Sequence, residues 1–380
     1  MNGAITSPLL RDSLAAVLRG EHVAWNALGL APDDLLEACI AQDLTALLHQ
    51  RLSQHSECTD WPRGLRDAVA QHAHAEAARE MLRRNEIVSA LDSLAAAGVQ
   101  PILLKGTPLA YSAYEVPSAR PRGDTDLLVL REQVEAARCA MTAIGYSPTL
   151  CCDGELVFCQ FEMSKSDRFG VNHAFDFHWK ISTQSLFADL LSYDELAADA
   201  LPVPALGTHA RAAGLLHALL LACVHPVMHH RCVPRVLWIH DIHLLASQLS
   251  AVEFDRFVDL AIAKNVTAIV RHELALSRSL WGTSIPDSAA ARLRASEMPE
   301  RSATYLLPDR RWHHELVSNI RCLPAWPGRF RLLREVLFPG PAYMLRSYGL
   351  TTGAYRAALL PALYLHRIVH GAVQVLLGRK

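Results

Sequence analysis

Two pairs of polar side chains, each pair set two residues apart, indicate a site for metal-dependent chemistry. Asp124 and Asp126 begin a short run that continues with apolar residues of strand type. Residues two apart in a strand project from one face, so the two carboxylates should lie side by side. Like charges so close together are costly to bury unless a cation lies between them, and Mg²⁺ prefers such oxygen ligands. The alternative is a surface strand with two solvated aspartates.

The second pair belongs to a stretch in which aromatic and polar residues alternate, His173–Ile181. One face of this predicted strand carries Phe175, Phe177, Trp179 and Ile181, and the other carries Asp176, His178 and Lys180. If the strand pairs beside residues 124–130, Asp176 joins the two aspartates as a third carboxylate. An ordinary amphipathic strand with a wet polar face is the alternative.

A turn upstream of the aspartates has the features of a phosphate-binding turn. Residues 99–104 predict a strand, Lys105 and Gly106 follow at once, and residues 107–114 predict a helix capped by Thr107. A glycine lets backbone amides approach a phosphate, and a helix N-terminus favours negative charge. The cations predicted to assist are Lys105, Arg120 and Arg122. The alternative for each is a solvated surface side chain, and the sequence has neither a GxxxxGK[ST] nor a GxGxxG pattern.

The elements around these residues predict an α+β fold. Residues 1–85 have helical spacing of their apolar side chains, and residues 204–380 are again helical in pattern. Between them, residues 86–203 alternate short strands with helices, including a predicted strand at Leu156–Phe161 and a helix at residues 131–144. We therefore expect a small mixed β-sheet core flanked by helical N-terminal and C-terminal regions.

Composition narrows the classes of partner and the cellular location. The 380 residues carry 37 Lys and Arg against 38 Asp and Glu, so no bulk attraction to nucleic acid is expected. The nine cysteines include no CxxC pair, which favours a reducing compartment, and we predict a cytoplasmic protein. The N-terminal residues do not resemble a signal peptide, and no apolar stretch has the length of an integral membrane segment.

Three motifs in order resemble those of the uncharacterised bacterial nucleotidyltransferases in the DNA polymerase β-like superfamily. They are Leu103-Leu104-Lys105-Gly106, Arg120-Pro121-Arg122-Gly123-Asp124-Thr125-Asp126-Leu127-Leu128-Val129 and Asp176-Phe177-His178-Trp179. Weaker similarity continues at Leu237–Asp241 and Leu337–Pro339. The sequence departs from the wider superfamily at its turn, where Lys105-Gly106-Thr107 replaces Gly-Ser or Gly-Gly, so that Thr107 would have to supply the hydroxyl group.

The resemblance implies a reaction and a role for each candidate residue. A nucleoside monophosphate would move from an NTP, with ATP the expected donor, to a small-molecule, peptide or protein acceptor, and pyrophosphate would leave. Asp124, Asp126 and Asp176 would hold Mg²⁺ or Mn²⁺, and His178 is an acid–base candidate. The substrate-binding candidates are Lys105, Gly106, Thr107, Arg120, Arg122, Lys180 and Asp241.

Other functions remain open at this stage. A partner-binding, antitoxin-like module with a vestigial site would keep the same motifs, and a phosphotransferase could use the same carboxylates. His225 and His229 lie four residues apart, as zinc ligands do, but neither an HExxH pattern nor a nearby cysteine pair accompanies them. With His230, His240 and His243 they are better explained as residues lining a cleft or as buried histidines. No GxSxG pattern supports a serine hydrolase.

Overall fold

The computed structural model describes residues 8–54, 60–149, 154–230, 232–295, 300–307, 310, 312–350 and 356–376. These residues form two compact units, each assembled from separate stretches of chain. The first unit comprises the chain up to Asp92, Ile102–Thr125 and Asp199–Leu306, and the second comprises Ser93–Pro101, Asp126–Ala198 and the chain from Leu307 onward. The division into three regions at residues 85 and 203 stays a prediction.

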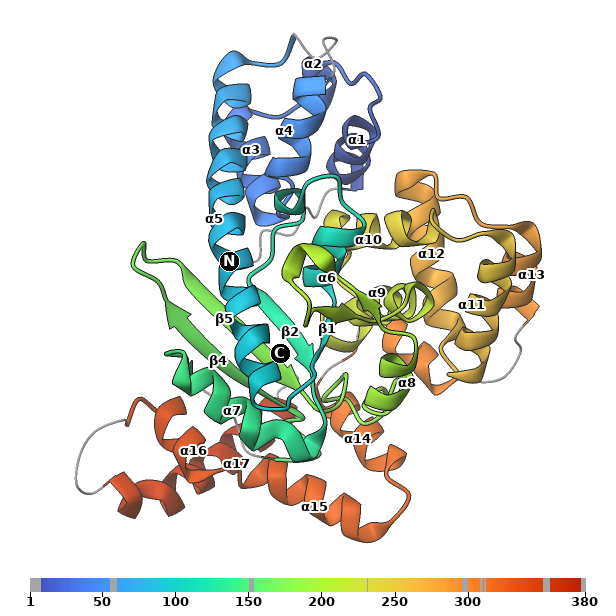
Figure 1. Cartoon of the computed structure of the whole chain (residues 1–380). Coiled ribbons are helices and arrows are strands. Elements are labelled where there is room, and N and C mark those ends of the chain that lie inside the picture. The colour runs from blue at the N-terminus through green and yellow to red at the C-terminus, as the bar shows by residue number, and fades with distance from the viewer. Residues whose placement is uncertain are drawn as a thin grey trace. The chain divides into compact units, whose positions relative to one another are not determined.

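The N-terminal part of the first unit is helical, as its apolar spacing predicts. Its helices are α1 (Pro8–Leu18), α2 (Trp25–Leu28), α3 (Pro32–Ala41), α4 (Thr45–Gln54) and the long α5 (Arg63–Ala96), which continues past Asp92. In Figure 1 the blue helices α3 and α4 lie beside the N-terminal half of α5, and α1 lies next to α4. Their buried leucines surround Trp61, whose indole N–H donates to the Val23 carbonyl at 3.1 Å.

The strands of the first unit are short and carry the turn at Lys105. β1 (Ile102–Leu104) pairs in parallel with β7 (Arg211–Ala212), and β7 pairs antiparallel with β6 (Leu201–Pro202). Helix α6 (Gly106–Ser112) follows β1 directly, and the 3₁₀ turn Pro117–Ala119 leads toward β2 (Asp124–Leu128). The boundary between the two units falls within β2, after Thr125.

The rest of the first unit is a group of helices. It contains α9 (Leu215–His229), α10 (Val236–Ala246), α11 (Ala251–Ala263), α12 (Thr267–Trp281), α13 (Asp287–Ala295) and the 3₁₀ helix Arg301–Leu306. The start of α11 is set by a capping box, in which Ser250 and Glu253 satisfy each other's backbone N–H groups. Pro226 lies inside α9 without ending it.

The second unit is built on an antiparallel sheet in the order β3-β4-β5, from β3 (Ser147–Pro148), β4 (Gln160–Ser166) and β5 (Asn172–His178). Phe161 of β4 stacks on Phe177 of β5, with the ring centroids 4.7 Å apart. Helix α7 (Val134–Ala143) lies beside this sheet in Figure 1, and its Arg138 covers the Phe161 ring. Phe175 and Phe177 of the aromatic face predicted for His173–Ile181 are therefore buried.

Further helices complete the second unit: α8 (Tyr193–Ala198), α14 (Trp312–Cys322), α15 (Trp326–Leu337), α16 (Pro341–Ser347), the 3₁₀ turn Arg356–Leu359 and α17 (Leu360–Leu376). Among the described residues, no helix combines the length and the apolar character needed to span a bilayer.

The predicted α+β class is confirmed, because helices predominate and the strands include parallel and antiparallel pairs. Three local predictions are wrong. The strand expected at Leu156–Phe161 begins only at Gln160, because the backbone N–H groups of residues 155–157 bind the Glu335 carboxylate instead. β5 ends at His178, so Lys180 lies beyond the strand. Thr107 does not cap α6, which begins at Gly106.

Candidate functional site

Asp126, Asp176 and His178 lie together in the second unit, and we call them the carboxylate–histidine group. One potential ligand atom from each lies within 4.8 Å of the other two. His178 Nε2 is 2.9 Å from Asp126 Oδ1 and 3.4 Å from Asp176 Oδ2. A hydrogen bond from the Val129 N–H to the His178 carbonyl holds the end of β2 beside the end of β5. Strand pairing therefore assembles this group from residues 52 positions apart.

Strand β4 contributes two further side chains to the polar face of this sheet. Gln160 is opposite His178 in the register and donates from Nε2 to Asp176 Oδ2 at 2.9 Å. Glu162 is directly opposite Asp176, and directly opposed residues project from the same face with their Cβ atoms about 5 Å apart. The face therefore carries more negative charge than the sequence motifs alone predicted.

The burial of these carboxylates fits a divalent cation. Asp126 and His178 are almost fully buried, with 5% and 1% of their surface exposed. Asp176 Oδ1 is a buried oxygen with no hydrogen-bond partner among the described residues. Burying such an oxygen removes it from water without a new hydrogen bond, which costs free energy. A bound cation would offset this cost. Carboxylate oxygens are the ligands that Mg²⁺ and Mn²⁺ prefer, so the donor set suits either ion.

The two other predicted residues near this group occupy different positions. Asp124 is the exposed first residue of β2, and strand alternation gives it the same face as Asp126. Lys180 forms an ion pair with Asp189, Nζ to Oδ1 at 2.9 Å, at an exposed position. Nothing in this arrangement connects Lys180 with the carboxylate–histidine group, and its substrate-binding role stays a prediction.

In the first unit, the Lys105–Gly106 turn has an unusual backbone. Lys105 adopts φ +56° and ψ −133°, a conformation that L-residues rarely take, and it precedes the first turn of α6. Backbone strain of this kind costs about 1–3 kcal/mol and is often found at functional sites. A Cβ at Gly106 would lie 3.1 Å from Arg120 Nη2, so the guanidinium packs directly on the glycine backbone. An alanine here would press its Cβ against the guanidinium, so the close approach favours glycine.

Arg120 and Asp241 form a buried, two-pronged ion pair. Arg120 Nε donates to Asp241 Oδ1 and Nη2 donates to Oδ2, both at 2.8 Å, and each side chain is less than 10% exposed. Tyr114 adds a hydrogen bond from its hydroxyl to Asp241 Oδ1 at 2.7 Å. Parallel N–H···O bonds of this type are the strong form of an ion pair.

Arg122 forms a second buried pair, with Glu80 of α5. Its Nη2 donates to Glu80 Oε1 at 2.8 Å, and its Nε donates to Thr107 Oγ1 at 3.0 Å. Glu80 also accepts from Tyr111 Oη and from Arg83 Nη1. We call Arg120, Arg122, Asp241 and Glu80 the arginine cluster. Each arginine binds a carboxylate of the same unit, and contact with a triphosphate stays a prediction.

Burial and these charges shift the pKa values within the first unit. Burial, followed by the charge of Asp241, raises the pKa of Tyr114 well above its ordinary value. Burial alone would lower the pKa of Arg120, but the neighbouring Asp241 charge reverses this and the guanidinium stays protonated. Burial, assisted by His243 and two arginines, lowers the pKa of His240 to about 3, so His240 is neutral at physiological pH.

The remaining histidines do not assemble a metal site. Within the described residues, the carboxylate–histidine group is the cluster of three or more ligating side chains that could hold a metal ion. His225 and His230 pack against Trp238, and His240 packs against Trp281 with ring centroids 4.1 Å apart. These histidines therefore contact aromatic side chains, and of the three only His240 is buried.

Sequence reasoning missed three residues that bind the predicted ones or lie directly opposite them: Glu80, Gln160 and Glu162. Glu162 had a signal, because polar and apolar residues alternate from Gln160 to Ser164 as they do in β5. Glu80 had none, since it belongs to a long helix rich in charged residues.

Comparison with known proteins gives one family. The model of a family described as "Uncharacterised nucleotidyltransferase" matches residues 29–282. This range includes both the carboxylate–histidine group and the arginine cluster. No curated protein matches the chain.

Proposed function

The chain belongs to this family of uncharacterised nucleotidyltransferases, and on that basis we propose that it transfers a nucleoside monophosphate from an NTP to an acceptor, releasing pyrophosphate. Membership confirms the resemblance seen in the sequence and supports nucleotidyl transfer as the general chemistry. The observation that carries the proposal is the buried carboxylate–histidine group, in which Asp176 Oδ1 lacks a hydrogen-bond partner within the described residues.

Asp126 and Asp176 would hold Mg²⁺ or Mn²⁺, with Asp124 added by its position on the same strand face. A bound divalent cation supplies charge stabilisation for the transferred phosphate and for the pyrophosphate leaving group. His178 Nε2 contacts both carboxylates and would hold their orientation. In the proposed reaction Asp176 accepts the acceptor's proton, because its Oδ1 is the oxygen still able to receive a hydrogen bond.

The phosphate-binding part of the proposal concerns Lys105, Gly106, Thr107 and the two arginines. The strained Lys105 backbone and the N-terminus of α6 support an anion site at this turn. Arg122→Lys should weaken NTP binding although it keeps the charge, because a lysine cannot replace the two-pronged contacts of the guanidinium. Arg84→Lys is the control, since the partner of Arg84 within the described residues is a backbone carbonyl, that of Ala205.

The deciding experiment follows the phosphorus atoms. The full chain, Mg²⁺ and a panel of acceptors are incubated with ATP labelled separately at the α- and γ-positions. Label from the α-position should reach the acceptor, and pyrophosphate should appear in equal amount. Label only from the γ-position would establish a phosphotransferase and overturn the proposal. Metal-independent NTP binding without transfer would instead establish a vestigial binding module. We also propose that ATP is the nucleotide donor and that the protein is cytoplasmic.

A further inference from the structure

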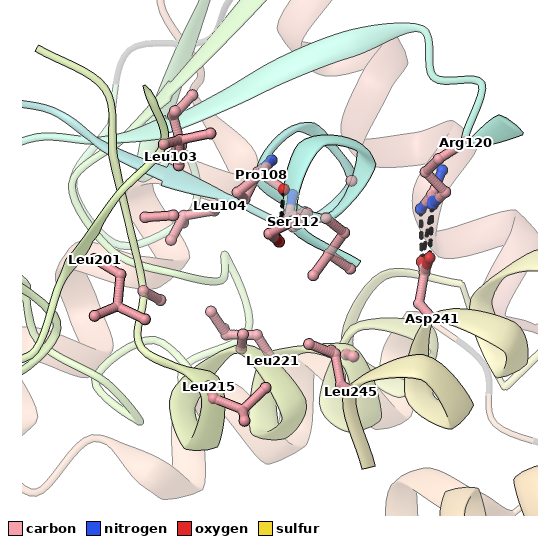
Figure 2. A pocket seen from close by; sticks show the side chains of 18 of the residues that line it. Leu103, Leu104, Pro108, Ser112, Arg120, Leu201, Leu215, Leu221, Asp241 and Leu245 are labelled. Atoms are coloured by element: carbon pink, nitrogen blue, oxygen red, sulfur yellow. Dashed lines mark hydrogen bonds and ion pairs between the residues drawn. The ribbon is translucent and has the colours of Figure 1, made fainter. Parts of the chain in front are cut away.

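The first unit contains a cavity of about 240 Å³, partly open to solvent, whose walls are mostly apolar. Figure 2 shows leucine side chains from several elements facing this space: Leu103 and Leu104 of β1, Leu201 of β6, Leu215 and Leu221 of α9, and Leu245 of α10. Along α9, Ala218, Ala222 and His225 also line it, at a spacing that places them on one helix face. Four elements, β1, β6, α9 and α10, thus contribute leucine side chains to one cavity.

Four polar side chains of the cavity wall already bind protein atoms. Ser112 Oγ donates to the Pro108 carbonyl at 2.9 Å, and Gln248 Nε2 donates to the Leu244 carbonyl at 3.1 Å. Arg120 and Asp241, at one end of the view in Figure 2, bind each other. A polar ligand would therefore lose water without gaining equivalent partners along most of the wall, which favours an apolar occupant.

A nucleobase does not fit these walls. Purines and pyrimidines present hydrogen-bonding atoms on most of their edges, and each unpaired one would cost desolvation free energy. A hydrocarbon carries no such cost and gains from burial. An engineered cavity of about 150 Å³ binds benzene, so by proportion one of about 240 Å³ holds about ten non-hydrogen atoms.

Lys105 and Gly106 of the candidate phosphate-binding turn also line this cavity. An amphiphile whose hydrocarbon fills the cavity could therefore place its polar group at that turn. We propose that the cavity binds the hydrocarbon part of the acceptor, an aliphatic chain of about ten carbons, with the acceptor's hydroxyl or similar polar group directed toward Lys105. The identity of this ligand as acceptor rests on the proposed nucleotidyl transfer, but its binding does not require metal or NTP.

The test is a chain-length series measured on the full chain without metal or NTP. Hexan-1-ol, octan-1-ol, decan-1-ol and dodecan-1-ol are titrated by calorimetry. Each methylene that enters the cavity should tighten binding by about fourfold, and the gain should stop near ten carbons. A gain that continues unchanged to dodecan-1-ol, or no binding of decan-1-ol, overturns the proposal.

Two substitutions sharpen this test. Ala218→Phe fills the cavity from α9 and should weaken decan-1-ol binding at least tenfold, and Ala222→Leu is the smaller alternative should the first variant not fold. Leu365→Phe is the matched control, because Leu365 is an exposed α17 residue outside the cavity wall. Equal affinity in all variants, or displacement of decan-1-ol by adenosine, would contradict an aliphatic site.

The two proposals can fail separately. Decan-1-ol binding with no transfer of α-label to any acceptor would leave the aliphatic site and remove the nucleotidyltransferase. Transfer of α-label to an acceptor by a chain that binds no alcohol of the series would do the reverse.

Discussion

The two clusters of charged side chains, one in each unit, differ in how completely their charges are matched. In the arginine cluster, Arg120 faces Asp241 and Arg122 faces Glu80, each through bonds of 2.8 Å. In the carboxylate–histidine group, two carboxylates share a single histidine, and a buried oxygen of one has no hydrogen-bond partner within the described residues. In the first arrangement the protein's own carboxylates pair with both arginines and hold the loop before β2. In the second, the proposed cation would balance the remaining negative charge.

The largest expected effect comes from removing one carboxylate of the carboxylate–histidine group. Asp126→Asn should lower nucleotidyl transfer by roughly 10³-fold, because a neutral amide holds a divalent cation poorly. In a thermal melt, Mg²⁺ should raise the melting temperature of the natural chain and leave that of the variant unchanged. Equal stabilisation of both proteins by Mg²⁺ would show that the metal binds elsewhere.

The next largest effect should come from breaking an ion pair of the arginine cluster. Asp241→Asn leaves the buried Arg120 guanidinium without its charge partner and should cost about 3–5 kcal/mol of unfolding free energy, measured with urea. Asp189→Asn, which removes the exposed partner of Lys180, is the control and should cost less than about 1 kcal/mol. Similar losses in the two variants would mean that the buried pair is no more important than a surface one.

A smaller effect is expected at the glycine on which Arg120 packs. Gly106→Ala places a Cβ 3.1 Å from Arg120 Nη2 and should destabilise the chain by about 1–3 kcal/mol through overpacking. Gly64→Ala, in the first turn of α5 where a Cβ meets nothing within 4 Å, should instead stabilise it slightly. Stabilisation by both alanines, checked by the same urea transitions, would contradict the close approach.

The smallest effect is a pH dependence in the first unit. His240 has a folded-state pKa of about 3, below its ordinary value, so the unfolded chain binds a proton that the native chain does not. The contribution of neutral His240 to the free energy of unfolding is therefore fully present above about pH 6.5. It is lost as the pH falls toward 3, by about 1.4 kcal/mol per pH unit. His240→Gln should reduce the slope of unfolding free energy between pH 4 and 6 by this amount. An unchanged slope would place the titration on other groups.

Local periodicity was enough to predict the elements that carry the carboxylates. The alternation from His173 to His178 predicted β5 and its buried aromatic face, because it depends only on neighbouring residues. The strand predicted at Leu156 failed because Glu335, 179 residues away, binds the Leu156 backbone N–H at 2.9 Å. Thr107 has the residue type of a cap, but its hydroxyl accepts from Arg122. Such distant partners leave no trace in a local pattern.

Among the site residues, too, those placed by local patterns could be predicted and those placed by distant partners could not. The proximity of Asp126, Asp176 and His178 follows from two strand patterns and one pairing, and it could be anticipated. The partners of Arg120 and Arg122 could not, since Glu80 is one of several acidic residues of α5, and Asp241 of α10 lies 121 residues from Arg120 in the sequence. The sequence predicted that both arginines bind phosphate because a planar guanidinium can donate to two oxygens at once. The same geometry explains why they bind the carboxylates of Asp241 and Glu80.

The discontinuity of the first unit affects the order of events during synthesis. Arg120 and its partner Asp241 are 121 residues apart, and the whole second-unit stretch Asp126–Ala198 is made between them. At translation rates of 5–20 residues per second, Asp241 follows Arg120 by about 6–24 s. The β3-β4-β5 sheet can therefore form on the ribosome before Arg120 meets its partner. During this interval Gly106 and Arg120 lie on a surface that is exposed because Asp241 has not yet been made. A nascent-chain chaperone could bind that surface.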